Sequence, residues 1–168
     1  MAVLVFVLLP LFSSMAAADD RLIEGQCHNA EVPAVCMQCV NSDPEAGQAD
    51  RVGVAAIVLN CLTNHSKTLY HDMAELASSS QDKNTEAVAK ICQKGYSDAG
   101  QQLGAAAQAL KSGDYDMANA SVREALENDV ACGNEGESCK LNFPPEVVYE
   151  MRVYEELADA ALRIIDRL

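Results

Sequence analysis

The chain has 168 residues and carries 25 acidic against 12 basic side chains, which gives a formal net charge of −13 at pH 7. An acidic surface repels nucleic acids and anionic membranes. The absence of tryptophan and the scarcity of other aromatic residues argue against a stacking platform for bases or sugars. The charge suits a basic partner, although acidity is also a common route to solubility.

The N-terminal segment, residues 1–18, is almost wholly apolar and ends in the small-residue run Met15-Ala16-Ala17-Ala18. This pattern is typical of a secretory signal peptide, although no basic residue precedes Arg21. An uncleaved membrane anchor is the alternative, but the apolar run over 2–12 is too short to span a bilayer. We therefore expect cleavage after residue 18, one domain over 19–168, and no membrane association after cleavage.

All seven cysteines follow this leader, which fits an oxidising compartment. Because seven is odd, at least one thiol is free or pairs with another molecule. Zinc binding is the alternative use, since Cys36-Met37-Gln38-Cys39 is a Cys-x-x-Cys pair. No second Cys or His pair follows at a finger-like spacing, and no βαβ pattern supports a redox motif. We expect no metal site.

Short helical pieces are predicted within residues 22–40, separated near Pro33 because proline cannot continue a helix. Folding these pieces against each other would bring Cys27 and Cys36 together. After a turn-rich loop, a long helix is expected over 49–77. Its apolar seam steps by threes and fours through Val52, Ala55, Leu59, Leu62, Ser66, Leu69, Met73 and Leu76.

A second long helix is expected over 85–111, capped by Asp82 or Asn84. Its many alanine and glycine residues keep it thin, which allows close approach of neighbouring helices and indicates a position deep in a bundle. Its inward stripe is Val88, Cys92, Tyr96, Ala99, Leu103, Ala106 and Leu110.

The third helix is expected over 115–130, after Gly113 ends the second and Asp114 provides the cap. These two helices form a hairpin. If they are antiparallel, Cys92 and Cys132 return to the same end of it, and a bridge there would staple the two helices together.

The rest of the chain is expected as a loop over 133–143 and a last helix that runs to Leu168. Pro144-Pro145-Glu146 is a suitable helix start, with proline in the first turn and an acid near the positive helix end. Strand patterns are absent and the links are short, so sequential helices should be antiparallel neighbours. The predicted fold is all-α: an up-down-up-down four-helix bundle with an N-terminal helical extension.

Catalytic motifs are missing from the sequence: there is no nucleophile elbow, no phosphate-binding glycine loop and no His-Glu-x-x-His. No motif places the histidines, and we expect His65 and His71 on solvated helix faces. These observations favour a binding protein over an enzyme and imply no cofactor. Two sequons make Asn64 and Asn119 candidate glycosylation sites.

The cysteine spacing resembles that of the plant invertase and pectin methylesterase inhibitor family. Cys27 and Cys36 lie near the mature N-terminus, and Cys92 and Cys132 bracket a helical hairpin. The Ala-rich helix after Cys92, the turn Leu110-Lys111-Ser112-Gly113-Asp114-Tyr115 and the ending Ala125-Leu126 also match, so the resemblance covers about residues 22–168.

This resemblance implies a four-helix bundle with an N-terminal helical hairpin and the bridges Cys27–Cys36 and Cys92–Cys132. It also implies a secreted monomer of the apoplast and cell wall that inhibits a cell-wall enzyme stoichiometrically, 1:1, by covering its active-site groove. The inhibitor itself performs no chemistry.

The residues that distinguish the two targets of the family depart from both patterns. Pectin methylesterase inhibitors often have Thr before the fourth cysteine, where this chain has Ala131. Of the acid positions on the helix after the third cysteine, Asp98 matches but Lys94 and Gln101 do not. Invertase inhibitors that plug the active site carry Pro-Lys-Phe after the Gly-Asp turn, where this chain reads Tyr115-Asp116-Met117.

Pectin methylesterase is the expected target, with cell-wall or vacuolar acid invertase as the alternative and a non-inhibitory secreted binding protein as a further one. We expect Asp98, Ala131 and Asn134 to contribute to the target-binding face. A solvated helix residue is the plainer interpretation of Asp98.

Three cysteines fall outside the framework that the resemblance supplies. A Cys39–Cys61 bridge would tie the N-terminal extension to the first long helix and leave Cys139 free. Burial of Cys39 and Cys61 as small apolar side chains is the alternative.

Overall fold

The computed structural model describes residues 13–139 and 141–168, and every long element in them is an α-helix. The order is α1 (Ser13–Cys27), α2 (Pro33–Ser42), the short 3₁₀ helix η1 (Ala46–Gln48), α3 (Arg51–Ser79), α4 (Lys83–Ser112), α5 (Tyr115–Ser138) and α6 (Pro145–Ile165). Most of the expected leader lies outside the described residues, and α1 begins at Ser13.

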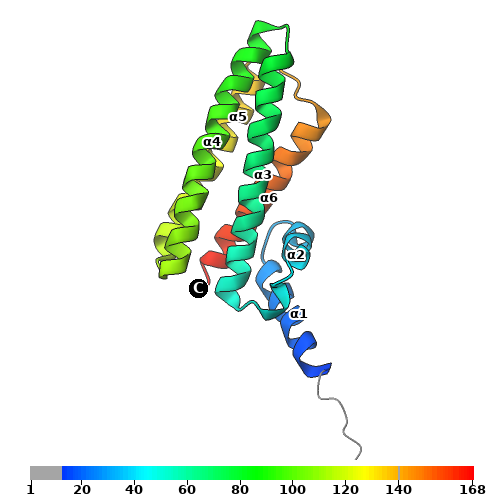
Figure 1. Cartoon of the computed structure of the whole chain (residues 1–168), viewed down its shortest axis with the longest axis vertical. Coiled ribbons are helices and arrows are strands. Elements are labelled where there is room, and N and C mark those ends of the chain that lie inside the picture. Colours follow the sequence, from blue (N-terminus) through cyan, green and yellow to red (C-terminus); the bar gives the residue numbers. More distant parts are fainter. Residues whose placement is uncertain (1–12, 140) are drawn as a thin grey trace, which may run out of the picture.

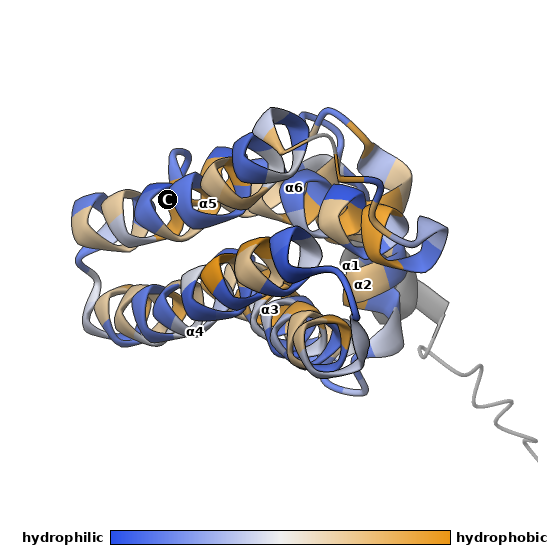
Figure 2. Cartoon of the chain, turned by 90° about the horizontal axis from the view of Figure 1, so that it is seen from above, coloured by the Kyte–Doolittle hydropathy of each residue, from blue (hydrophilic) through white to orange (hydrophobic). Residues whose placement is uncertain are grey.

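The four long helices α3 to α6 form an elongated bundle, and α1 and α2 pack at one end of it (Figure 1). Each long helix packs against its neighbour in sequence, and α3 also packs against α6, which closes the bundle. Seen from above, α3 and α4 lie on one side and α5 and α6 on the other (Figure 2). The predicted four-helix bundle with an N-terminal helical hairpin is confirmed.

Aspartate residues cap the N-termini of α3, α4 and α5. The carboxylate of Asp50 accepts a hydrogen bond from the Gly53 N–H, and Asp114 accepts one from the Met117 N–H. Asp82, one of the two expected caps, accepts from the Thr85 N–H at 2.9 Å. Each cap satisfies a backbone donor that has no partner within its helix.

The turn between α4 and α5 depends on Gly113. This residue has φ = 80°, in the left-handed region, and its N–H bonds to carbonyls of the last helical turn. A side chain would clash with the backbone in that conformation. The tight turn brings α5 back antiparallel to α4.

The predicted seams form the core. All seven positions of the α4 stripe are buried, and the α3 seam is buried from Ala55 to Met73, with only its end members Val52 and Leu76 half-buried. Stepping by threes and fours therefore identified the inward faces of both helices.

The expected loop over 133–143 is wrong in its first half, because α5 continues to Ser138. Gly133 and Gly136 lower helix propensity, but tertiary packing overrides it here. An added Cβ at the buried Gly136 would lie only 2.6 Å from Cε2 of Phe143, so this glycine makes room for the aromatic ring. The Leu141 N–H bonds to the Gly136 carbonyl at 2.8 Å and closes the helix end.

Polar contacts join the N-terminal extension to α6 and to the residues that follow it. Arg167 Nη2 donates to the Gln26 carbonyl at 2.6 Å, and Asp159 accepts from the Glu31 N–H at 2.8 Å. Arg51, at the start of α3, donates in turn to the Arg167 carbonyl. Within the described residues, no helix combines the length and apolarity that crossing a membrane requires.

Candidate functional site

Three disulfides hold the molecule together, and they match the pairs considered from the sequence. Cys27–Cys36 closes the N-terminal hairpin, and Cys39–Cys61 joins α2 to α3. Cys92–Cys132 joins α4 to α5, with Cα atoms 4.8 Å apart. Cys139 remains free and exposed.

The stapled α4–α5 hairpin is tightly packed. One turn beyond the Cys92–Cys132 bridge, a Cβ added at Gly95 would lie 3.4 Å from the Asn128 carbonyl oxygen. The small residue lets the two helices approach each other closely. The bridge and this contact also fix the antiparallel register of the hairpin.

This register separates the residues expected on the target-binding face. It places Asp98 opposite about residue 126, so Ala131 lies about 8 Å and Asn134 about 12 Å farther along the hairpin axis, at 1.5 Å per residue. Ala131 and Asn134 are exposed, while Asp98 is half-buried and forms an ion pair with Lys94 on its own helix. The three residues share the hairpin but do not form a contact cluster.

A buried polar cluster lies inside the hairpin, next to its staple. The Tyr96 hydroxyl donates to Oδ1 of Asp129, and the Tyr154 hydroxyl donates to the Ala125 carbonyl at 3.2 Å. The two tyrosine rings pack edge to face with centroids 6.0 Å apart. Ser66 of α3 donates to the Tyr96 carbonyl at 3.0 Å, so all four bundle helices meet here.

Sequence reasoning missed Asp129 as a core residue. The α5 stripe was followed only as far as residues 125 and 126, but the next step of four reaches Asp129 and a further step of three reaches Cys132. Both are buried, and Asp129 is 0 % exposed. Continuing the stripe to the cysteine would have placed this acid inside the bundle.

Burial raises the pKa of Asp129 to about 7; the hydrogen bond from Tyr96 acts in the opposite direction, and the negative charge of Glu155 adds to the rise. Burial and the Asp129 charge also raise the pKa values of Tyr96 and Tyr154. Both tyrosines are therefore neutral donors.

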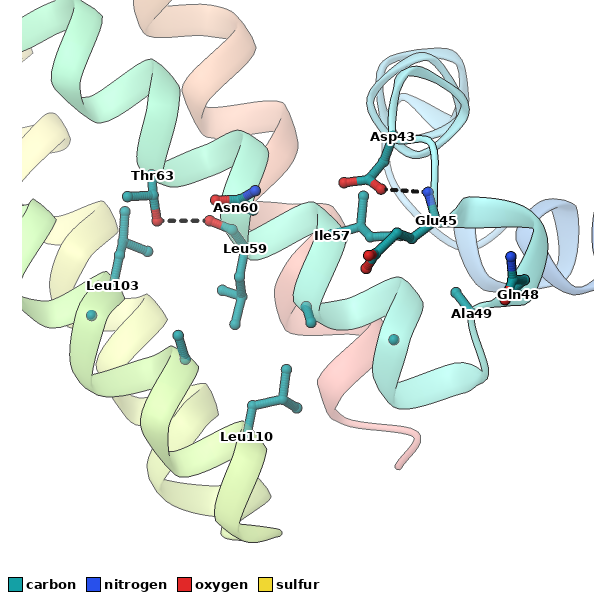
Figure 3. A pocket seen from close by; sticks show the side chains of 14 residues that line it. Asp43, Glu45, Gln48, Ala49, Ile57, Leu59, Asn60, Thr63, Leu103 and Leu110 are labelled. Carbon is teal, nitrogen blue, oxygen red and sulfur yellow. Dashed lines mark hydrogen bonds between the residues drawn. The ribbon is translucent and has the colours of Figure 1, made fainter.

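A groove of about 730 Å³ lies between α3, α4 and the link that contains η1 (Figure 3). Its base includes the buried Leu59, Leu103 and Leu110, and small residues of α3 and α4 line its walls. Asp43 and Glu45 supply acidic groups, with no basic side chain among the described lining residues. The groove was not predicted from the sequence, although the many small residues of α4 were a signal for it.

His65 and His71 both lie on α3 but in different surroundings. The expectation that His65 lies on a solvated face is wrong: it is half-buried, with Nδ1 2.5 Å from Oε2 of Glu150, because α6 covers that side of α3. His71 is exposed, as expected, and its ring packs edge-on against Tyr70. Among the described residues, no three His, Cys, Asp or Glu side chains are grouped to hold a metal ion.

The two sequons differ in their surroundings. Asn64 is exposed on α3. Asn119 is half-buried, and its side chain donates to Asp166 and accepts a hydrogen bond from Arg123.

The sequence profile described as plant invertase/pectin methylesterase inhibitor matches residues 21–164. The chain belongs to this family. It is 27% identical over 151 residues to a pectinesterase inhibitor of Actinidia deliciosa, an alignment that covers 90% of this chain and 81% of that protein. It is 26% identical over 157 residues to the cell wall / vacuolar inhibitor of fructosidase 2 of Arabidopsis thaliana, covering 92% and 87% of the two chains.

The crystal structure of a mutant form of a pectin methylesterase inhibitor from Arabidopsis has the same fold. The TM-score is 0.75 at 20% identity, over 87% of this chain and 96% of the other. The family and these relatives are inhibitors rather than enzymes.

Proposed function

We propose that this chain is a secreted proteinaceous inhibitor of pectin methylesterase. The observation that carries the proposal is the family match, which spans the bundle from α1 almost to the end of α6. The pectinesterase inhibitor relative, aligned over most of both chains, supports the choice of target. Acid invertase is the alternative target, favoured by the similarity to an inhibitor of fructosidase.

Inhibition proceeds by occlusion. The inhibitor binds the enzyme as a monomer in a 1:1 complex, and its disulfide-linked α4–α5 hairpin covers the active-site groove of the enzyme. The face includes Asp98, Ala131 and Asn134. A standard interface buries about 800 Å² per partner, which is wide enough to include all three at the spacing that the register gives. Two disulfides and the Asp159 and Arg167 contacts hold the N-terminal extension, and the third disulfide holds the hairpin, so little conformational entropy is lost on binding.

The net charge of −13 steers the inhibitor toward a basic target. Cleavage after Ala18 and export to the apoplast and cell wall complete the proposal. The association rate should fall as salt rises, because steering is screened over about 8–10 Å at physiological ionic strength.

The test is an inhibition titration of the purified mature protein against a plant pectin methylesterase and, separately, an acid invertase. We expect stoichiometric loss of pectin methylesterase activity. Loss of invertase activity alone would transfer the function to the alternative target. Full activity of both enzymes at micromolar inhibitor would overturn the inhibitor assignment.

The face is tested with two charge reversals that change the net charge equally. Asp98→Arg lies on the hairpin, and Glu45→Arg lies at the α3–α4 groove. We expect the hairpin change to weaken inhibition at least tenfold more than the groove change, because a repulsive contact adds to the shared loss of steering. Equal effects would refute the assignment of the α4–α5 hairpin as the binding face but not the inhibitory function. Thermal melts of the Asp98→Arg variant check that the new arginine beside Lys94 leaves the helix intact.

A further inference from the structure

Asp129 is a buried acid with one unpartnered oxygen. It is 0 % exposed, and Oδ1 accepts a hydrogen bond from the Tyr96 hydroxyl. Oδ2 has no hydrogen-bond partner, and it is the one buried side-chain polar atom in that state among the described residues. Such atoms are rare in folded proteins because each one retains its desolvation cost.

The groups that face Asp129 provide no positive charge. From α4 it meets Tyr96, and from α6 it meets Tyr154 and the carboxylate of Glu155. From α3, Ser66 contributes a neutral hydroxyl to the same cluster. No ion pair among the described residues includes Asp129. An ionised carboxylate here would be desolvated, unpaired and close to a second anion.

Protonation removes each of these costs. A proton on Oδ2 neutralises the buried charge and ends the repulsion from Glu155. It also converts the unpartnered acceptor into a donor, for which the Glu155 carboxylate on α6 is the acceptor within reach. The Tyr96 hydroxyl can still donate to Oδ1.

The cluster lies beside the disulfide that joins α4 to α5. Asp129 is three residues before Cys132 and Tyr96 is four residues after Cys92, so both lie one helical turn from the bridge that joins α4 to α5. Any change at Asp129 therefore acts on the packing between these two helices.

We propose that Asp129 is an acid-dependent lock of the α4–α5 hairpin: it is protonated when the helices are packed, and its ionisation toward neutral pH weakens that packing. The lock does not depend on which enzyme the hairpin binds.

The direction of the pH effect follows from linkage. The pKa of Asp129 in the folded protein is raised to about 7, above its ordinary value of 3.8. A raised folded-state pKa gives stability that is fully present below pH 4 and is lost as pH rises through 7. Each unit of difference is a factor of ten in the folding equilibrium constant, so the loss is on the order of a thousandfold.

The test compares urea unfolding of the wild type and Asp129→Asn between pH 4 and pH 8. Asparagine has the shape of the protonated acid but does not ionise. We expect the folding constant of the wild type to fall on the order of a thousandfold relative to that of the variant as pH rises. Asp98→Asn is the matched control, because it neutralises a surface acid of the same hairpin, and its profile should parallel that of the wild type.

Parallel profiles for the wild type and Asp129→Asn would overturn the lock. If the variant does not fold, NMR titration of the side-chain carboxyl carbon of Asp129 in the wild type measures the pH at which this group ionises. A midpoint near 7 supports the lock, and a midpoint below 5 refutes it. Glu155→Gln should move that midpoint to lower pH, because it removes the facing anion; an unchanged midpoint would show that Glu155 takes no part.

Discussion

Removing the Cys92–Cys132 bridge tests how the staple stabilises the bundle. The bridge closes 40 residues of chain. In the chain-entropy description, a loop of that length lowers the stability of the unfolded state by about 4 kcal/mol at 25 °C. We expect the double variant Cys92→Ala, Cys132→Ala to lose about that much free energy of unfolding, measured by urea denaturation in a Cys139→Ser background that prevents thiol exchange.

The matched control is Cys27→Ala, Cys36→Ala, which removes the same atoms from two other buried positions but opens a loop of only nine residues. The same relation predicts a loss of about 2.6 kcal/mol there. The difference between the two variants, about 1.3 kcal/mol, isolates loop length from the loss of buried sulfur. Equal losses, or a larger loss at the N-terminal bridge, would refute the entropic account and point to native-state packing as the source of stability.

Two further predictions concern backbone conformation and glycosylation. Gly113→Ala should lower the free energy of unfolding by about 1–2 kcal/mol, because φ is 80° there. Gly104→Ala should raise it by up to about 1 kcal/mol, because this glycine lies in the interior of α4 with open space around it. Thermal or urea unfolding of both variants checks that the two changes have opposite signs. A glycan on Nδ2 of Asn119 would disrupt the hydrogen bond from this side chain to Asp166. The protein glycosylated at Asn119 should therefore melt at a lower temperature than the protein glycosylated at the exposed Asn64. Melting of secreted Asn64→Gln and Asn119→Gln proteins, before and after deglycosylation, compares the two sites.

The helices that the sequence predicted best are those with long uninterrupted seams. In α3 and α4 many apolar positions repeat at one period, so each position supports the others and errors stay within about two residues at the ends. Asp82 and Asp114 were recognised because capping is a local interaction between residues three apart.

The features that were missed depend on contacts between distant residues. Gly136 has no side chain because the ring of Phe143, beyond the helix end, occupies the space where a Cβ would lie. His65 is paired because Glu150 reaches it from a helix 85 residues away in sequence. Asp129 is different, because the spacing of the α5 stripe through Ala125 to Cys132 does place it on the inward face. Only its partners Tyr96 and Glu155 come from other helices. Local patterns contain no information about such partners.

The candidate binding face was only partly predictable for a related reason. Cysteine spacing identified the hairpin, because a bridge between antiparallel helices needs both cysteines at one end. The distances between Asp98, Ala131 and Asn134 depend on the register of α4 against α5, which the close approach at Gly95 and Asn128 helps to set. A sequence alone does not show that approach.

The fastening of the N-terminal extension to α6 has a consequence for biosynthesis. Arg167 and Gln26 are 141 positions apart, so α1 and α2 are synthesised well before Arg167, and this contact can form only after α3 to α6 have been made. During that interval Cys27, Cys36, Cys39 and Cys61 are all available to one another. The nine-residue separation of Cys27 and Cys36 costs less entropy to close than the 22-residue separation of Cys39 and Cys61, so we expect the first of these two bridges to form before the second. An insertion or tag directly beside Arg167 would therefore disturb the contacts that hold the N-terminal extension in place.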